Sequence, residues 1–312
     1  MEIRRLYSAP KVAIPDAAAV RWITLPATRG KEEAMTRTYP AADHRFWTAL
    51  ARAFGGAVVF ALPLLMTAEM WEIGATVEPH RLLVLLAGSF PLLVGLSYIA
   101  GFEDTFNVQE DTLDAAVALG IGLAASALLL WLFGAFHPGI RPAEAIGMIA
   151  LQAVPGAIGA LLSRSLLHKS RADDRVARRR QVASYRAELF TMAVGALFLA
   201  LNIAPTEEIQ LIALRLDEWH LLLLMAVSLV AMHGFVYGLE FRGGTGATEG
   251  SPLLGVALRF TAPGYLVALL VSLLVLWVFG RTEGLSFAPL LAIVLVLGLP
   301  AALGAAAARL VL

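Results

Sequence analysis

Long apolar runs alternate with short polar segments along most of the chain. Each run holds about 20 predominantly apolar residues, the length that an α-helix needs to cross the hydrocarbon core of a membrane. Eight such runs lie near residues 47–69, 81–101, 113–134, 143–163, 186–206, 219–239, 258–279 and 287–308. The pattern therefore predicts an all-α polytopic membrane protein with about eight transmembrane helices.

Composition supports this prediction and excludes several classes of function. Hydrophobic residues make up 59% of the chain and charged residues 15%, against roughly 45–50% and 25% in soluble domains. The formal net charge is zero, so no global field attracts nucleic acid. The chain has no cysteine, which excludes disulfides, thiolate nucleophiles and cysteine-bound metals. We expect the lipid bilayer as partner and no cofactor.

The distribution of Lys and Arg predicts the orientation in the membrane. Basic residues gather in residues 1–45 and again after the fourth span, in residues 164–186. An even number of spans separates the two segments, so the positive-inside rule places both of them, and both termini, in the cytoplasm. The arginine-rich composition is typical of a bacterial protein, so we expect the bacterial inner membrane. Residues 1–45 form an irregular tail in this scheme, and Met35 is an alternative start to Met1.

The two halves of the chain resemble each other. Ser126–Gly134 (SALLLWLFG) and Ser272–Gly280 (SLLVLWVFG) are identical at six of nine positions. Further matches follow in the same order: Pro155 aligns with Pro300 and Arg164 aligns with Arg309. The pattern predicts an internal duplication with repeats at 46–164 and 186–312, joined by an Arg-rich linker at 165–185. Repeats of four spans share one orientation, so a pseudo-two-fold axis should run along the membrane normal.

Small residues recur on the fourth and eighth spans, where Gly156, Gly159, Gly304 and Ala305 are examples. Such residues let helix backbones approach closely in lipid. We expect them to pack helices within the chain, and a homodimer interface is the alternative.

Carboxylates at the outer ends of the spans form the first candidate site. Glu69 and Glu208 occupy matching places in the two repeats, and Glu207 is the neighbour of Glu208. A break of the fifth span at Pro205, followed by further apolar residues, would partly bury Glu207 and Glu208. Two acids near one axis would repel each other and raise one pKa, as in a proton or cation site. The alternative is a pair of solvated interfacial carboxylates.

The second candidate site lies at the inner ends of the spans. Glu103 and Glu240 again match between the repeats, and the oxygen-rich stretch 103–114 suggests a mouth that attracts cations. Its spacing does not match an EF-hand, so the identity of any metal stays open. His233 and Asn202 lie inside spans; His233 is a candidate proton relay or a hydrogen-bonded packing residue.

No enzyme motif accompanies these residues: the sequence lacks HExxH, GxSxG and a phosphate-binding glycine loop. The leading hypothesis is a transporter or channel for protons or another small cation, and not an enzyme. A membrane scaffold or sensor that uses the arginines of 175–180 against anionic lipid or a partner is the alternative. A lipid-modifying enzyme is less favoured, because it would need reactive groups at one depth in the membrane. Here the acids lie at both ends of the spans, and the middle of the spans has almost no ionisable residues.

The Gly101–Asp104 turn (GFED), the WLFG and WVFG segments and the duplicated layout resemble a family of bacterial integral membrane proteins without an assigned function. The resemblance covers roughly residues 45–312. It implies a membrane protein and supplies no catalytic or binding residues.

Overall fold

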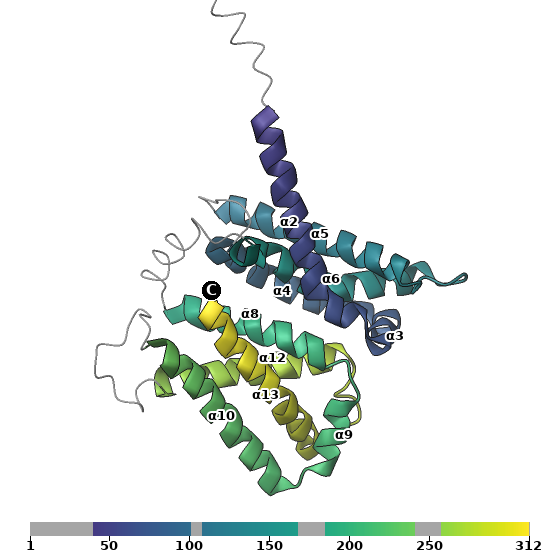
Figure 1. Cartoon of the computed structure of the whole chain (residues 1–312). Helices are drawn as coiled ribbons and strands as arrows, with labels where there is room; N and C mark the ends of the chain where they lie inside the picture. Colours follow the sequence, from purple (N-terminus) through teal and green to yellow (C-terminus); the bar gives the residue numbers. More distant parts are fainter. Residues whose placement is uncertain (1–39, 101–107, 168–184, 241–256, 312) are drawn as a thin grey trace, which may run out of the picture. The chain divides into compact units, whose positions relative to one another are not determined.

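The computed structural model describes residues 40–100, 108–167, 185–240 and 257–311. These residues form helices and short connections, with no strand among them (Figure 1). Eight of the helices are long and apolar enough to cross a membrane. The chain is therefore an all-α polytopic membrane protein, as the apolar runs predicted. The tail at 1–39, most of the linker, and Glu103 lie outside the described residues.

The helices follow the same order in both halves of the chain. The first half contains α2 (Pro40–Leu65), α3 (Ala68–Thr76), α4 (Pro79–Ala100), α5 (Val108–Leu132) and α6 (Pro142–Leu167). The second contains α8 (Tyr185–Ile203), α9 (Glu208–Arg215), α10 (Glu218–Glu240), the π-helix η1 (Ala257–Thr261), α12 (Ala262–Val278) and α13 (Phe287–Val311). We call the end of the bundle where α8 begins and α13 ends the terminal end, and the opposite end the far end.

Two spans are shorter than their apolar runs predicted. The first run extends to residue 69, yet α2 ends at Leu65 and the short helix α3 follows. Thr67 accounts for the break, because its Oγ1 donates to the carbonyl of Leu64 at 2.8 Å and turns the chain. Thr206 makes the same contact with Ile203 at 3.0 Å after α8. The short helices α3 and α9 are apolar because each buries one face against the bundle.

The far ends of α5 and α12 close in the same way. Gly134 and Gly280 have φ of 73° and 72°, a left-handed conformation that glycine adopts without a Cβ penalty. The N–H after each glycine donates back to the helix, from Ala135 to Leu130 and from Arg281 to Leu276, both at 2.9 Å. This six-to-one bond is the Schellman arrangement, which ends a helix sharply. The WLFG and WVFG segments are thus helix-ending signals.

Glycine pairs bring helix backbones into direct contact within each half. A Cβ on Gly159 of α6 would overlap the carbonyl oxygen of Gly56 on α2, and a Cβ on Gly304 of α13 would overlap that of Gly195 on α8. Gly159 and Gly304 have the spacing that pairs Pro155 with Pro300, and Gly56 and Gly195 have the spacing that pairs Glu69 with Glu208. They favour the duplication hypothesis, which stays a prediction.

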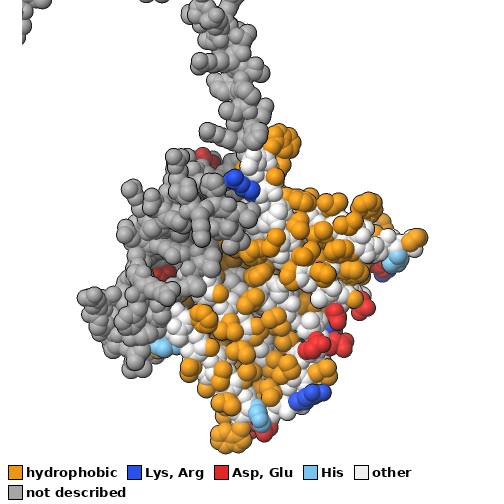
Figure 2. All heavy atoms as spheres, viewed as in Figure 1, with side chains coloured by type: hydrophobic (Ala, Val, Ile, Leu, Met, Phe, Trp, Pro, Cys, Tyr) orange, Lys and Arg blue, Asp and Glu red, His pale blue; other side chains and the backbone are white. Residues whose placement is uncertain are grey.

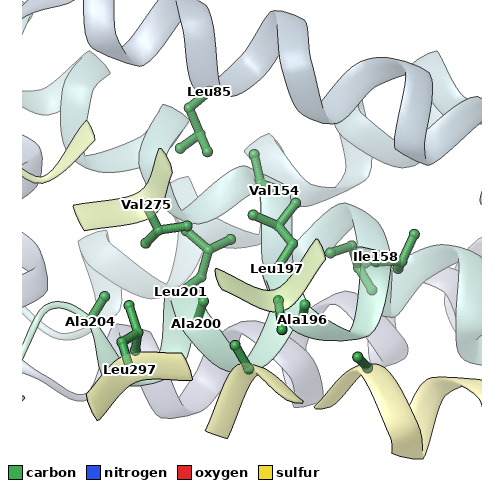
Figure 3. Close-up of a cluster of buried hydrophobic side chains, with 14 of the residues drawn as sticks. Leu85, Val154, Ile158, Ala196, Leu197, Ala200, Leu201, Ala204, Val275 and Leu297 are labelled. Atoms are coloured by element: carbon green, nitrogen blue, oxygen red, sulfur yellow. The ribbon is translucent and has the colours of Figure 1, made fainter. Parts of the chain in front are cut away.

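Apolar side chains join the two halves to each other. Figure 3 shows Leu85 and Val154 of the first half together with Leu197, Leu201 and Val275 of the second. The surface is also apolar: hydrophobic side chains cover much of the described face in Figure 2. Such a surface suits contact with lipid tails.

Adding one methyl group tests the close contacts. We expect Gly159→Ala to destabilise the protein by about 1–3 kcal/mol, the usual cost of overpacking. Gly88→Ala is the matched control, because no atom lies within 4 Å of a Cβ at that helical position. Its effect should be neutral or stabilising, by up to about 1 kcal/mol. Unfolding in detergent micelles measures both; equal effects would contradict backbone contact at Gly159.

Candidate functional site

The far-end carboxylates lie near the protein surface. Glu69 is half-buried in the first turn of α3, whereas Glu207 and Glu208 are exposed at the start of α9. The predicted helix break beside Pro205 is present, but the expected burial of Glu207 and Glu208 is wrong. The chain turns toward the surface there, so α9 begins outside the core. Among the described residues, none of these three carboxylates forms a hydrogen bond or an ion pair.

Two arginines cross-link the far end. Arg81 of α4 donates to the carbonyl of Trp277, at the end of α12, over 3.0 Å, and it pairs with Glu283 and Glu78. Arg281 donates to the carbonyl of Pro205 at 2.7 Å. Cations at the carboxyl ends of helices interact favourably with the helix dipole. Arg81 therefore ties the first half of the chain to the second.

The amino end of α10 carries a capping carboxylate at the same end of the bundle. The backbone N–H and the ring Nδ1 of His220 contact Asp217 Oδ1 at 2.9 and 2.7 Å. These contacts lower the pKa of Asp217, with the backbone hydrogen bond the larger cause. The cap is therefore present at neutral pH and is lost as the pH falls through this pKa.

Two carboxylates are buried in the terminal end of the first half. Asp111 and Asp114, one turn apart on α5, are 4% and 5% exposed. Ser97 of α4 donates to Asp114 at 2.6 Å and approaches Asp111 at 3.5 Å. Both acids lie inside a candidate membrane span. Carboxylates are costly at such positions, and in membrane proteins they commonly mark ion or proton pathways.

The terminal end of the second half brings a histidine to an irregular helix. His233 of α10 lies 2.9 Å from the hydroxyl of Thr261, measured from its Nδ1. Thr261 is buried at the end of η1, and π-helical turns occur frequently at functional sites. One turn deeper, the Tyr265 hydroxyl has no hydrogen-bond partner in the described structure, and the Ser228 hydroxyl donates to the carbonyl of Leu224 in its own helix at 2.7 Å. His233 is thus part of a line of polar groups between α10 and α12.

A largely buried ion pair lies beside this line. Arg309 of α13 contacts Glu188 of α8 at 2.9 Å, with the two side chains 11% and 13% exposed. The Arg309 guanidinium also lies 4.3 Å from the ring centre of Phe260 on η1. The pair joins the helices that Gly195 and Gly304 bring together.

The remaining predicted residues contribute little to these clusters. The Asn202 amide donates to the carbonyl of Phe198 in its own helix at 2.7 Å. The side chain of Glu240, like all of Glu103, lies outside the described residues. Within the described ranges, no three His, Asp or Glu side chains converge as metal ligands would.

Comparison with known proteins agrees with the fold. The family model described as "Putative integral membrane protein (DUF2391)" matches residues 49–312. The chain belongs to this family. No curated protein and no solved structure matches it. Membership in the family establishes an integral membrane protein and leaves the activity to be inferred from the site.

Asp111 and Asp114 belong to the oxygen-rich stretch 103–114 of the sequence prediction, but neither was singled out, because carboxylates that recur in both halves carried more weight. A signal for them existed. Together with Ala118, Gly122 and Ala125, they follow the helical spacing that marks one face of α5. A carboxylate on a stripe of small residues in an apolar helix indicates a buried group.

The ion pair gives a prediction of stability. Arg309→Gln removes the guanidinium that lies 2.9 Å from the largely buried Glu188 carboxylate, and we expect a loss of about 3–5 kcal/mol. The double variant Glu188→Gln/Arg309→Gln should recover much of this loss. Arg141→Gln is the control, since Arg141 and Glu144 form a more exposed pair worth about 0–1 kcal/mol. Chemical unfolding in micelles measures all three variants; similar losses for Arg309→Gln and Arg141→Gln would contradict the burial of the Arg309–Glu188 pair.

Proposed function

We propose that the protein moves protons or another small cation across the membrane. The observation that supports this most directly is the pair of buried acids on α5, Asp111 and Asp114, held by Ser97 inside a span. A carboxylate at this depth attracts a cation or exchanges a proton far more effectively than a solvated one, because little water screens it.

The second half supports the same function with different residues. His233 and Thr261 lie at the terminal end of that half, with Tyr265 and Ser228 one turn deeper. Imidazole and hydroxyl groups pass protons where a hydrogen bond joins them, as it joins His233 and Thr261. Glu69, Glu207 and Glu208 at the far end would attract cations to the opposite mouth.

Tight packing favours a transporter over an open channel. The gap between α4, α6 and α8, which Ser89, Leu93 and Val154 help to line, is too narrow for a water molecule. The middle of the described bundle is filled mainly by Ala, Leu and Val. An ion would therefore pass only when the helices rearrange, as in transporters that alternate their access. We place the protein in the bacterial inner membrane with both termini in the cytoplasm, following its basic segments.

Flux through proteoliposomes tests this proposal. We expect wild type to carry a proton or cation current, reported by pH-sensitive and ion-sensitive dyes inside the vesicles. Asp114→Asn keeps the size and hydrogen-bonding shape of the side chain and removes its charge, so flux should fall at least tenfold.

Glu72→Gln is the matched control, because Glu72 is an exposed far-end acid and its loss should leave flux close to wild type. Glu69→Gln/Glu208→Gln should slow entry at the far mouth without abolishing flux. Folded wild-type protein that moves none of the ions tested would contradict the function. Flux that is unchanged in Asp114→Asn would exclude the α5 carboxylates from the transport pathway.

A further inference from the structure

A fully buried glutamine interrupts the apolar middle of α6. Gln152 is 0% exposed, and neither Oε1 nor Nε2 has a hydrogen-bond partner in the described structure. On α5, the hydroxyl of Ser126 is also 0% exposed and lacks a partner there. Polar atoms without partners are costly inside a membrane protein, because no water replaces the missing bonds. Each such group in a native structure needs an explanation.

The two polar groups lie at the same level of one helix interface. Gly122 of α5 is in contact with α6 at Ala153 and Gly156, which fixes the register of the two antiparallel helices. Residues four apart share a helix face, so one turn from this contact Ser126 and Gln152 come to the same level. Both side chains therefore belong to the α5–α6 interface.

The second half of the chain lacks this arrangement. The sequence match that pairs Pro155 with Pro300 places Leu297 where α6 has Gln152. Ser272 matches Ser126, but its hydroxyl donates to the carbonyl of Ala268 at 2.8 Å. A glutamine is therefore not required to pack a helix at this place.

A backbone oxygen adds to the polar groups of the first half. Pro155 has no N–H, so the carbonyl of Leu151 loses its ordinary partner four residues later in α6. Leu151 is the neighbour of Gln152. Leu151 lies on the side of α6 that carries Val154 and Ile158, which line the gap toward α4 and α8. The α5–α6 interface itself therefore offers two neutral oxygen atoms, a carboxamide and a hydroxyl.

We propose that Gln152 Oε1 and Ser126 Oγ supply ligands of a binding site for a dehydrated monovalent metal cation, Na⁺ or K⁺. Neutral oxygens can replace the hydration shell of such an ion, as carbonyls do in selectivity filters. Divalent cations prefer carboxylates, and neither of the two ligands is one. The glycine contact at Gly122 closes the interface in this structure, so the ion enters when α5 and α6 separate.

The site extends the proposed function, on which its role in transport rests. Asp114 and Ser126 lie 12 positions apart on α5, or about 18 Å along the helix axis. The buried face between them carries Ala118 and Gly122, whose small side chains leave the least bulk in the way. An ion attracted at Asp114 would reach the neutral site further along the same face.

Thermal unfolding of the full chain in detergent tests the site without any membrane gradient. NaCl or KCl replaces choline chloride at constant ionic strength. A ligand that binds only the folded state stabilises it by RT ln(1 + [L]/Kd), so the unfolding temperature rises with the logarithm of the ligand concentration once that exceeds Kd. We expect such a rise with Na⁺ or K⁺ for wild type, and an apparent affinity at least tenfold weaker for Gln152→Leu, which installs the residue of the second half.

Two further variants keep the test decisive. Ser126→Ala removes a single oxygen and should also weaken binding, so it serves if Gln152→Leu fails to fold. Leu297→Gln is the matched control and should leave alkali-ion binding as in wild type. Wild type that is indifferent to both ions, or binding that survives in Gln152→Leu and Ser126→Ala, would overturn the site. Binding in a protein that moves no ion in vesicles would keep the site and contradict the transport function instead.

Discussion

The structure depends on backbone contact between helices at paired glycines. Lipid tails are as apolar as leucine side chains, so the hydrophobic effect gives little drive for helices to associate within a membrane. Close approach must supply dispersion contacts instead, and only small residues permit it. Gly56 with Gly159 and Gly195 with Gly304 do so at corresponding places in the two halves. These contacts bring α6 and α13 directly against α2 and α8, and a helix packed in this way can hold a polar group such as Gln152 away from lipid.

The eight long helices could be predicted because the membrane itself fixes their length and composition. The short helix α3 could not, since its residues continue the apolar run of α2. The break before α9 was predicted beside Pro205, but the turn of the chain toward the surface was not. What ends α2 and α8 is a single side chain, Thr67 or Thr206, folding back on the preceding turn. That contact has no periodicity. The cross-link from Arg81 to the end of α12 could not be predicted from the sequence either, because it joins residues 196 positions apart.

The candidate site was only partly predictable. Comparison of the halves singled out Glu69 and Glu208, and the structure places Glu208 at the surface. The buried polar groups occur instead where the halves differ in sequence. In the alignment of the halves, Gln152 corresponds to Leu297 and Asp114 corresponds to Phe260. If the chain arose by duplication, shared residues are those that both halves need for folding, such as the helix-ending glycines. Residues that carry chemistry need occur in one half only.

The central claim is that the buried face of α5, with α6, carries a cation. A crystal structure of the protein grown with rubidium, which replaces potassium and scatters anomalously, tests it most directly. The account predicts an anomalous peak within bonding distance of Gln152 Oε1 and Ser126 Oγ, with α5 displaced from α6 to make room. A well-ordered interface without a peak, in which both side chains bond to their own helix backbones, would contradict it.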